Sequence, residues 1–134
     1  MFSCLIIGDS TGVGTARAIN ERLEQRCDVL AVERATAAQI MAWPKPAKTY
    51  GSCIFAMGSN DPPGERSAEK LMRIRSAICF RRVIWLLPYG RPQAYTVSSV
   101  AARFGDETLD LRRFPSRDGI HPARYSDVAS ALLR

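Results

Sequence analysis

The sequence predicts an α/β protein in which one parallel β-sheet carries helices on both faces. Short apolar runs alternate with segments of helical periodicity along the whole chain, a pattern typical of parallel strands joined by crossover helices. No linker, internal repeat or low-complexity stretch divides the 134 residues. We therefore expect one domain over residues 1–134, long enough to bury a core without metal or disulfides.

Five runs of mostly apolar residues predict the strands of this sheet. In chain order they are Cys4–Gly8, Val29–Val32, Ser52–Met57, Arg82–Leu87 and the less apolar Glu107–Leu111. The first four are nearly continuous in their hydrophobicity, as expected of strands that are buried on both faces. A turn-forming sequence, Pro88-Tyr89-Gly90, ends the fourth run.

Five further segments place apolar side chains at helical spacing. They are Gly12–Gln25, Ala37–Trp43, Glu65–Cys79, Pro92–Phe104 and Pro122–Leu133. In the first segment Val13, Ala16 and Ile19 share one face of the predicted helix. The second segment is short because Pro44 and Pro46 cannot continue a helix.

The chain is basic, with a net charge of +6 and a pI near 9.5. The arginines are spread along the chain, and no dense basic run with interleaved aromatic residues occurs, so we expect no nucleic-acid partner. A solvated basic surface accounts for this charge. The alternative is attraction to an anionic substrate, a polyanionic glycan or nucleic acid.

Composition also bears on location and on cofactors. No apolar stretch approaches the roughly 18–20 residues of a membrane span, and no basic segment of a signal peptide precedes the first strand, so we expect a cytoplasmic protein. Release by another route would leave the same sequence pattern. Cys4, Cys27, Cys53 and Cys79 are widely spaced, which favours buried free thiols in a reducing compartment. With a single histidine we expect no metal site and no cofactor.

The first sequence motif is Gly8-Asp9-Ser10-Thr11-Gly12-Val13-Gly14, at the end of the first predicted strand. Ser10 would lie near the start of a helix, where free backbone N–H groups and the helix dipole favour negative charge. A phosphate-binding loop is the rival interpretation, but Ala16 and Arg17 stand where a P-loop needs lysine and a hydroxyl residue. This segment alone leaves an esterase and a nucleotide-binding module open.

Two further motifs follow later in the chain. Asn60 lies in the turn after the third strand and could donate its side-chain N–H to a developing oxyanion, although turn-forming residues there are also ordinary. His121 is the sole histidine, and Asp118 precedes it by three positions. A carboxylate beside an imidazole can hold its tautomer and stabilise the imidazolium that forms during proton transfer.

Together these segments resemble the SGNH (GDSL-type) hydrolase family over essentially the whole chain. The matching blocks, in the family's order, are Gly8-Asp9-Ser10, Gly58-Ser59-Asn60-Asp61 and Asp118-Gly119-Ile120-His121. The resemblance implies a three-layer α/β/α flavodoxin-like fold whose five parallel strands have the order 2-1-3-4-5. It also implies ester hydrolysis without a metal.

The resemblance assigns Ser10 as nucleophile, His121 as base and Asp118 as its orienting acid. The oxyanion would be held by the Ser10 N–H and the Asn60 side chain. The family usually adds a backbone N–H from a glycine after the second strand, but residues 32–38 contain no glycine. We place that donor at Ala35, and expect a weaker oxyanion hole if the position requires a positive φ.

The loops are short for this family, so we expect an open site and a small acyl group, such as acetyl or another short chain, on a small molecule or a glycan. Asp9, Arg34 and Tyr89 are candidate substrate contacts at or near the catalytic edge, where a cationic side chain could meet a sugar or an anionic carrier. Ordinary surface roles are the alternative for each. The oligomeric state is left open, and a monomer is compatible with the sequence. A weakly active or inactive binding protein of this fold is the alternative function, and a nucleotide-binding module is the third.

Overall fold

The computed structural model describes residues 3–22, 27–47, 49–78 and 81–133. Five strands form one parallel sheet in the order β2-β1-β3-β4-β5, which confirms the predicted topology. The strands are β1 (Cys4–Gly8), β2 (Asp28–Ala31), β3 (Ser52–Ala56), β4 (Arg82–Leu87) and β5 (Glu107–Asp110). A short 3₁₀ helix, η1 (Leu111–Arg113), follows β5 where the sequence predicts the last residue of a strand.

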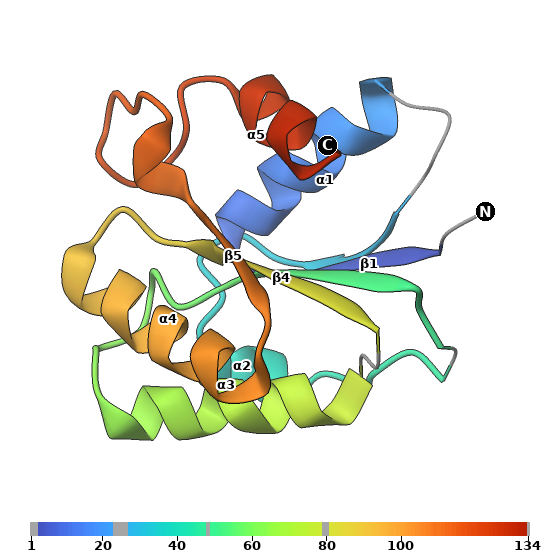
Figure 1. Ribbon diagram of the computed structural model, residues 1–134, viewed down its shortest axis with the longest axis vertical. Helices are drawn as coiled ribbons and strands as arrows, with labels where there is room; N and C mark the ends of the chain where they lie inside the picture. Colours follow the sequence, from blue (N-terminus) through green and yellow to red (C-terminus); the bar gives the residue numbers. More distant parts are fainter. Residues whose placement is uncertain (1–2, 23–26, 48, 79–80, 134) are drawn as a thin grey trace.

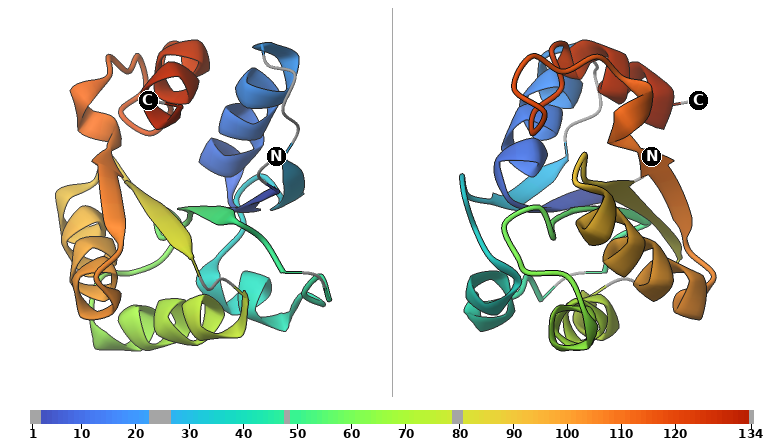
Figure 2. Two further views of the ribbon diagram at one scale, coloured as in Figure 1. Left: turned by 45° about the vertical axis from the view of Figure 1, so that its right-hand side comes forward. Right: turned by 90° about the vertical axis from the view of Figure 1, so that its left-hand side faces the viewer.

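The helices cover both faces of the sheet (Figure 1). They are α1 (Ser10–Arg22), α2 (Ala37–Ala42), α3 (Glu65–Ile78), α4 (Arg91–Phe104) and α5 (Tyr125–Leu132). Helices α1 and α5 lie on one face, and α2, α3 and α4 lie on the other, as the turned views of Figure 2 also show. The predicted ends Leu23–Gln25 of the first helix and Cys79 of the third fall outside the described residues.

Alternation along the strands divides the core between these two layers. On β3, Cys53 and Phe55 pack with α2, α3 and α4, whereas Ile54 and Ala56 pack with α1 and α5. Trp85 of β4 is fully buried in the first layer and stacks on Phe55 with ring centroids 4.5 Å apart. The two buried layers hold the strand ends at fixed positions, which is what a site at one edge of the sheet requires.

The last helix begins three residues later than the periodicity predicts. Pro122 forms an isolated antiparallel bridge with Ser116, and the Ala123 N–H donates to the Pro115 carbonyl at 2.8 Å. This pairing keeps residues 122–124 out of the helix, so α5 starts only at Tyr125. The same pairing closes the loop that carries His121.

The prediction of free thiols is wrong, because Cys4 and Cys27 form a disulfide and Cys53 is also disulfide-bonded. Parallel pairing of β1 with β2 explains the first bond. Leu5 is opposite Asp28 in the register, so the preceding residues Cys4 and Cys27 are neighbours, with Cα atoms 4.7 Å apart. Sequence spacing does not reveal this register. Disulfides persist in oxidising compartments, so the cysteines no longer support the expected reducing compartment.

Candidate active site

Ser10 lies at the carboxyl edge of the sheet, at the first position of α1. The turn from β1 into α1 is tight. A Cβ at Gly8 would overlap the carbonyl oxygen of Ala56 on the neighbouring strand, and the Asp9 N–H donates to that oxygen at 2.8 Å. As the first helical residue, Ser10 has a backbone N–H with no acceptor inside the helix. The glycine therefore brings the serine close to the end of β3, with a free donor beside its hydroxyl.

His121 meets Ser10 across 111 positions of sequence. Ser10 Oγ lies 2.9 Å from His121 Nε2, and His121 Nδ1 lies 2.7 Å from Asp118 Oδ2. Hydrogen bonds from His121 hold the pKa of the Asp118 carboxyl well below its usual range, so this group is an anion that can only accept. In the neutral imidazole the proton must then be on Nδ1, which leaves Nε2 to accept the Ser10 hydroxyl proton. This is the tautomer that general-base catalysis needs.

The loop that carries His121 is held by its own polar groups. Asp118 Oδ1 accepts the backbone N–H groups of Ile120 and His121 at 2.9 and 2.8 Å. Ser116 Oγ donates to the His121 carbonyl at 2.6 Å and accepts the Gly119 N–H at 2.9 Å. Ser116 was not among the residues predicted from the sequence, although a serine two residues before Asp-Gly is a turn signal that could have indicated it.

Asn60 is hydrogen-bonded to the loop that follows β2. Its side-chain Nδ2 donates to the Ala35 carbonyl at 3.1 Å, and the neighbouring Asp61 carboxylate accepts the Ala37 N–H at 3.0 and 3.1 Å, at the start of α2. An amide Nδ2 carries two protons, so one N–H of Asn60 is left to donate elsewhere. The ends of β1 and β3 are adjacent through the pair Gly8–Ala56, which brings the Asn60 loop to the same edge as Ser10.

Ala35 does not match the role that the sequence suggested for it. Its N–H donates to the Val32 carbonyl at 3.2 Å and closes a four-residue turn, and the residue is buried. That hydrogen bond occupies the donor that was assigned to the oxyanion. Ala35 itself has no positive φ, and the positive φ of this turn occurs one residue earlier, at Arg34, with φ 63°.

Asp9 is not a substrate contact, because it is fully buried beneath the site. Its Oδ1 accepts the backbone N–H and the hydroxyl of Thr11 at 2.9 and 2.7 Å, and its Oδ2 accepts the Ser59 hydroxyl at 2.8 Å. Burial raises the pKa of this carboxyl above its ordinary value. The Thr11 N–H contact is an N-terminal helix cap, which explains why α1 begins at Ser10 and not at Gly12.

Arg34 and Tyr89 lie in loops at this edge. The Tyr89 hydroxyl donates to the Phe114 carbonyl at 3.0 Å, so it braces the segment that leads to His121. Burial, followed by the charges of Asp118 and Asp110, raises the pKa of Tyr89. Arg34 is exposed, and its role as a substrate contact stays a prediction.

Gly12 and Gly14 lie inside α1 and do not form an open glycine loop. A Cβ at Gly12 would lie 3.3 Å from the Ala31 side chain, and one at Gly14 would overlap the Tyr125 ring on α5. These glycines therefore allow close packing of α1 against the sheet and α5. The phosphate cradle that a nucleotide-binding module needs at residues 8–14 is replaced by helix.

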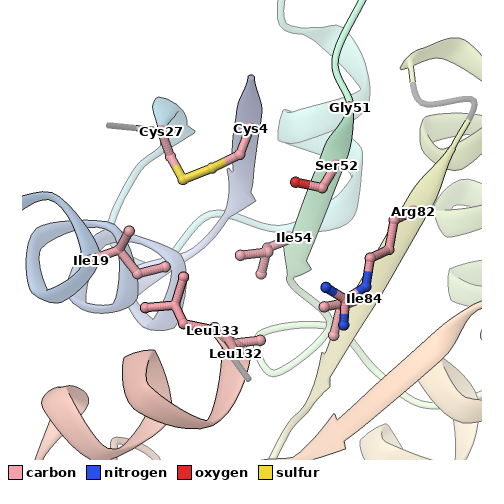
Figure 3. A pocket seen from close by; sticks show the side chains of 10 residues that line it. All are labelled: Cys4, Ile19, Cys27, Gly51, Ser52, Ile54, Arg82, Ile84, Leu132 and Leu133. Atoms are coloured by element: carbon pink, nitrogen blue, oxygen red, sulfur yellow. A yellow bond between two sulfur atoms is a disulfide. The ribbon is translucent and has the colours of Figure 1, made fainter. Parts of the chain in front are cut away.

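The opposite, amino edge of the sheet holds a cavity of about 310 Å³ (Figure 3). Its lining includes Ile19, Ile54 and Ile84, together with the Cys4–Cys27 disulfide. The cavity lies where β1, β3 and β4 begin, whereas Ser10 follows the end of β1. It is therefore distinct from the candidate active site.

The described ranges of the chain hold neither a cluster of metal ligands nor a membrane-spanning helix. No three histidine, cysteine, aspartate or glutamate side chains are grouped there as ligands for a metal ion. None of the helices in those ranges has the length and hydrophobicity to cross a bilayer.

Comparison with known proteins gives matches among solved structures alone. No protein-family model and no curated protein sequence matches the chain. A protein of Bacteroides ovatus named a GDSL-like lipase superimposes with a TM-score of 0.73 at 13% identity, covering 99% of this chain and 96% of that one. The aryl esterase of M. smegmatis gives a TM-score of 0.69 at 14% identity, covering 98% and 96%.

A protein of Slackia heliotrinireducens named as an SGNH hydrolase gives a TM-score of 0.65 at 17% identity, covering 98% of this chain and 96% of that one. At such identities the similarity establishes the fold alone. The chain has the fold of these SGNH and GDSL-type structures, as the resemblance of its motifs predicted.

Proposed function

We propose that this protein is a serine esterase that hydrolyses small acyl esters through an acyl-enzyme. The observation that carries the proposal is the continuous line of hydrogen bonds from Ser10 Oγ through His121 to Asp118, which starts at the N-terminus of α1. A serine hydroxyl becomes a useful nucleophile when an oriented base accepts its proton. The esterase and hydrolase names of the proteins that share the fold support the same reaction class.

In the proposed reaction, Ser10 Oγ attacks the ester carbonyl carbon while His121 Nε2 accepts the hydroxyl proton. The carbon–oxygen bond to the alcohol then breaks, and the imidazolium returns its proton to the departing alcohol oxygen. Water attacks the acyl-Ser10 intermediate by the same route and releases the carboxylic acid. Asp118 holds His121 in position and stabilises the imidazolium in both halves of the reaction.

The negative charge that develops on the carbonyl oxygen needs donors at the carboxyl edge. The Ser10 N–H and the second N–H of Asn60 are the proposed donors, and the positive end of α1 adds a favourable field. Each such donor contributes on the order of 10²–10³ in rate in serine hydrolases.

The exposure of the site favours a small acyl group on a larger alcohol. The side chains of His121 and Asp118 are 39% and 52% exposed, so the site is open to solvent beside the imidazole. An acetyl or other short-chain ester, on a small molecule or a glycan, fits such a site.

A weakly active binding protein is the second candidate, and one observation favours it. The Ala35 N–H, assigned from the sequence as a further oxyanion donor, is committed to Val32. If Ser10 and Asn60 supply too little stabilisation, the protein would bind an ester without turning it over.

Hydrolysis of p-nitrophenyl acetate tests the two candidates. We expect measurable turnover by the unaltered protein, loss of at least about 10³-fold in kcat for Ser10→Ala, and covalent labelling of Ser10 by an organophosphonate. Ser76→Ala is the matched control, because Ser76 is an exposed serine on α3 that bonds the Met72 carbonyl. Equal rates for the unaltered protein and Ser10→Ala, with no labelling, would leave the binding protein as the remaining candidate.

A further inference from the structure

Arg34 has a backbone conformation that arginine seldom adopts. It is the only non-glycine residue with a positive φ among those that the structure describes, at 63°. It is the third residue of the turn Val32–Ala35, which the Ala35 N–H closes on the Val32 carbonyl. A positive φ at this position alone defines a type II turn, in which glycine or asparagine is preferred. The turn therefore holds arginine at a cost in stability.

This turn forms part of the wall of the candidate active site. The Val32 N–H donates to the Gly8 carbonyl at 3.1 Å, which anchors the turn two residues from Ser10. The Ala35 carbonyl accepts the hydrogen bond from Asn60 Nδ2 at 3.1 Å. Arg34 lies between these two anchors in the chain, so its backbone belongs to a turn that contacts both the end of β1 and Asn60.

The Arg34 guanidinium makes no contact that stabilises the fold in the described parts of the chain. The residue is exposed and makes no ion pair or hydrogen bond there, and Glu33, the one acid of the turn, is not paired with it. An exposed side chain contributes nothing to the core. Neither packing nor turn preference accounts for an arginine at this position.

The other side of the site is also cationic. The segment from Leu111 to Arg124, which carries His121, contains four arginines and one acid, Asp118, which is already bonded to His121. The four arginines are exposed: Arg112, Arg113, Arg117 and Arg124. The net positive charge of this segment favours an anionic ligand, and Arg34 adds a further cation beside Glu33 on the turn.

We propose that Arg34 is a specificity-determining residue that binds an anionic group on the substrate, so that the enzyme prefers anionic esters to neutral ones. The inference rests on the proposed esterase function and names the class of substrate that this site takes. The strained turn, which is anchored to Gly8 and Asn60, carries a long cationic side chain where a glycine would supply none. An anion on either the acyl group or the alcohol could meet this charge, and the two cases are separated by experiment.

The test compares matched pairs of esters that differ in one negative charge. The pair 4-acetoxybenzoate and 4-acetoxybenzamide places the charge on the alcohol side, and p-nitrophenyl hemisuccinate and p-nitrophenyl butyrate place it on the acyl side. We expect kcat/KM to favour the anionic member of at least one pair by about tenfold, and this preference to shrink as salt is added. Equal values within both pairs overturn the proposal.

Three variants separate charge from backbone effects. Arg34→Asn keeps a residue that tolerates positive φ but removes the cation, so the preference should fall about tenfold. Arg34→Lys keeps the charge and should retain most of the preference. Arg103→Asn makes the same charge change at an exposed position in the last turn of α4 and should leave the preference as it is. If Arg34→Asn keeps the preference, Arg34 does not set it.

Two measurements do not depend on turnover. Arg34→Gly should raise the Tm by a few degrees, because glycine adopts a positive φ without strain. The same substitution removes the cation. Calorimetric binding of 4-acetoxybenzoate to Ser10→Ala, with and without Arg34→Asn, reports on anion binding even if no ester is hydrolysed. If 4-acetoxybenzoate binds in a way that depends on Arg34 but no ester is hydrolysed, only the proposed esterase function is contradicted. If esters are hydrolysed but the preference for anionic esters does not depend on Arg34, only the present inference is contradicted.

Discussion

The two edges of the sheet are built from the same five strands but have opposite chemistry. At the carboxyl edge, polar side chains converge. The backbone there approaches so closely at Gly8 that a Cβ would not fit, and it has a positive φ at Arg34. At the amino edge, the Cys4–Cys27 disulfide borders an apolar cavity, and Arg82 pairs with Glu107 across β4 and β5. The candidate catalytic groups lie at the carboxyl edge, and the disulfide and the ion pair that restrain the chain lie at the amino edge.

The direction of the chain accounts for this division. In a parallel sheet with crossover helices, every strand runs into a helix or loop at its carboxyl end, so helix N-termini and turn residues meet there. Buried polar groups and tight turns at that edge cost stability. Covalent and apolar contacts at the amino edge offset part of that cost. The difference leads us to expect that substitutions at the carboxyl edge change activity most, and those at the amino edge change stability most.

The largest effect is expected from His121→Ala. Without the base, kcat for p-nitrophenyl acetate should fall by roughly 10⁴–10⁶-fold. The Tm should stay within about 2 °C, because surface changes outside packed features have small effects on stability. Steady-state kinetics and thermal unfolding of the same preparation measure both. A decrease in kcat of less than tenfold would show that His121 is not the catalytic base and that the carboxyl edge is not the catalytic site.

The pH dependence sharpens the same assignment. His121 must be neutral to act as a base, so kcat/KM should rise with pH between about 5 and 8. Titration of Asp118 should not change kcat/KM in this pH range. Its hydrogen bonds with His121 keep its pKa below the ordinary carboxyl range, so the group stays ionised. A flat profile across that window is the contrary outcome.

The next largest effect is expected at the amino edge, from the double substitution Cys4→Ser with Cys27→Ser. The bond closes a loop with a sequence separation of 23, and loss of that constraint should lower the free energy of unfolding by about 3 kcal/mol. Urea unfolding of the oxidised protein and of the variant measures this difference. The kcat at a temperature where both are folded should differ less than about twofold. A variant with unchanged stability but lost activity would reverse our comparison of the edges.

A smaller effect is expected from Asp9→Asn, beneath the nucleophile. Burial raises the pKa of Asp9, so the folded protein holds the proton more tightly than the unfolded chain does, and stability falls as pH rises from the unfolded value to the folded one. Asparagine can keep both Thr11 contacts without this cost. We expect the variant to gain stability over the unaltered protein as pH rises, by less than the disulfide contributes.

Urea midpoints at several pH values from about 4 to 8 measure the Asp9→Asn difference. Asp127→Asn is the matched control, because Asp127 is an exposed acid in the first turn of α5. A gain that is largest at low pH would contradict the assigned direction of the pKa change.

The smallest effect is expected from Glu107→Gln. Arg82 and Glu107 are joined at 2.7 Å but are half exposed, and such pairs contribute about 0–1 kcal/mol. Arg82 lowers the pKa of Glu107, so the contribution is present above the unfolded carboxyl pKa and is lost as pH falls through the folded one. The effect should vanish in high salt, as measured by Tm with and without added salt. A loss well above 1 kcal/mol would mean that this ion pair matters more than its exposure indicates.

Much of the fold could be predicted from the sequence because its signals are local. Continuous apolar runs, helical spacing and proline positions are properties of short segments, and they predicted all five strands and all five helices with shifts of a few residues at their ends. The errors at helix ends occurred where a specific hydrogen bond or backbone pairing overrides periodicity. The bridge between Ser116 and Pro122 delays α5, and the side chain of Asp9 lets α1 begin early, at Ser10.

The candidate site divides in the same way. Ser10, Asn60 and His121 were identified because residue type and position at a strand end are written in the sequence. The burial of Asp9 depends on how other segments pack around it, and the hydrogen bond of the Ala35 N–H depends on the conformation of its turn, so neither follows from residue type alone.

The sequence by itself determined the layers, the strand order implied by its motifs, and which chemical groups stand at the carboxyl edge. Tertiary structure decided which side chains meet, as in the 2.9 Å contact between Ser10 and His121 and the pairing of Cys4 with Cys27, and it set the positive φ at Arg34. The reason is physical. Periodicity and residue type act over a few positions, whereas register, burial and hydrogen-bond partners are settled when segments far apart in the chain pack together.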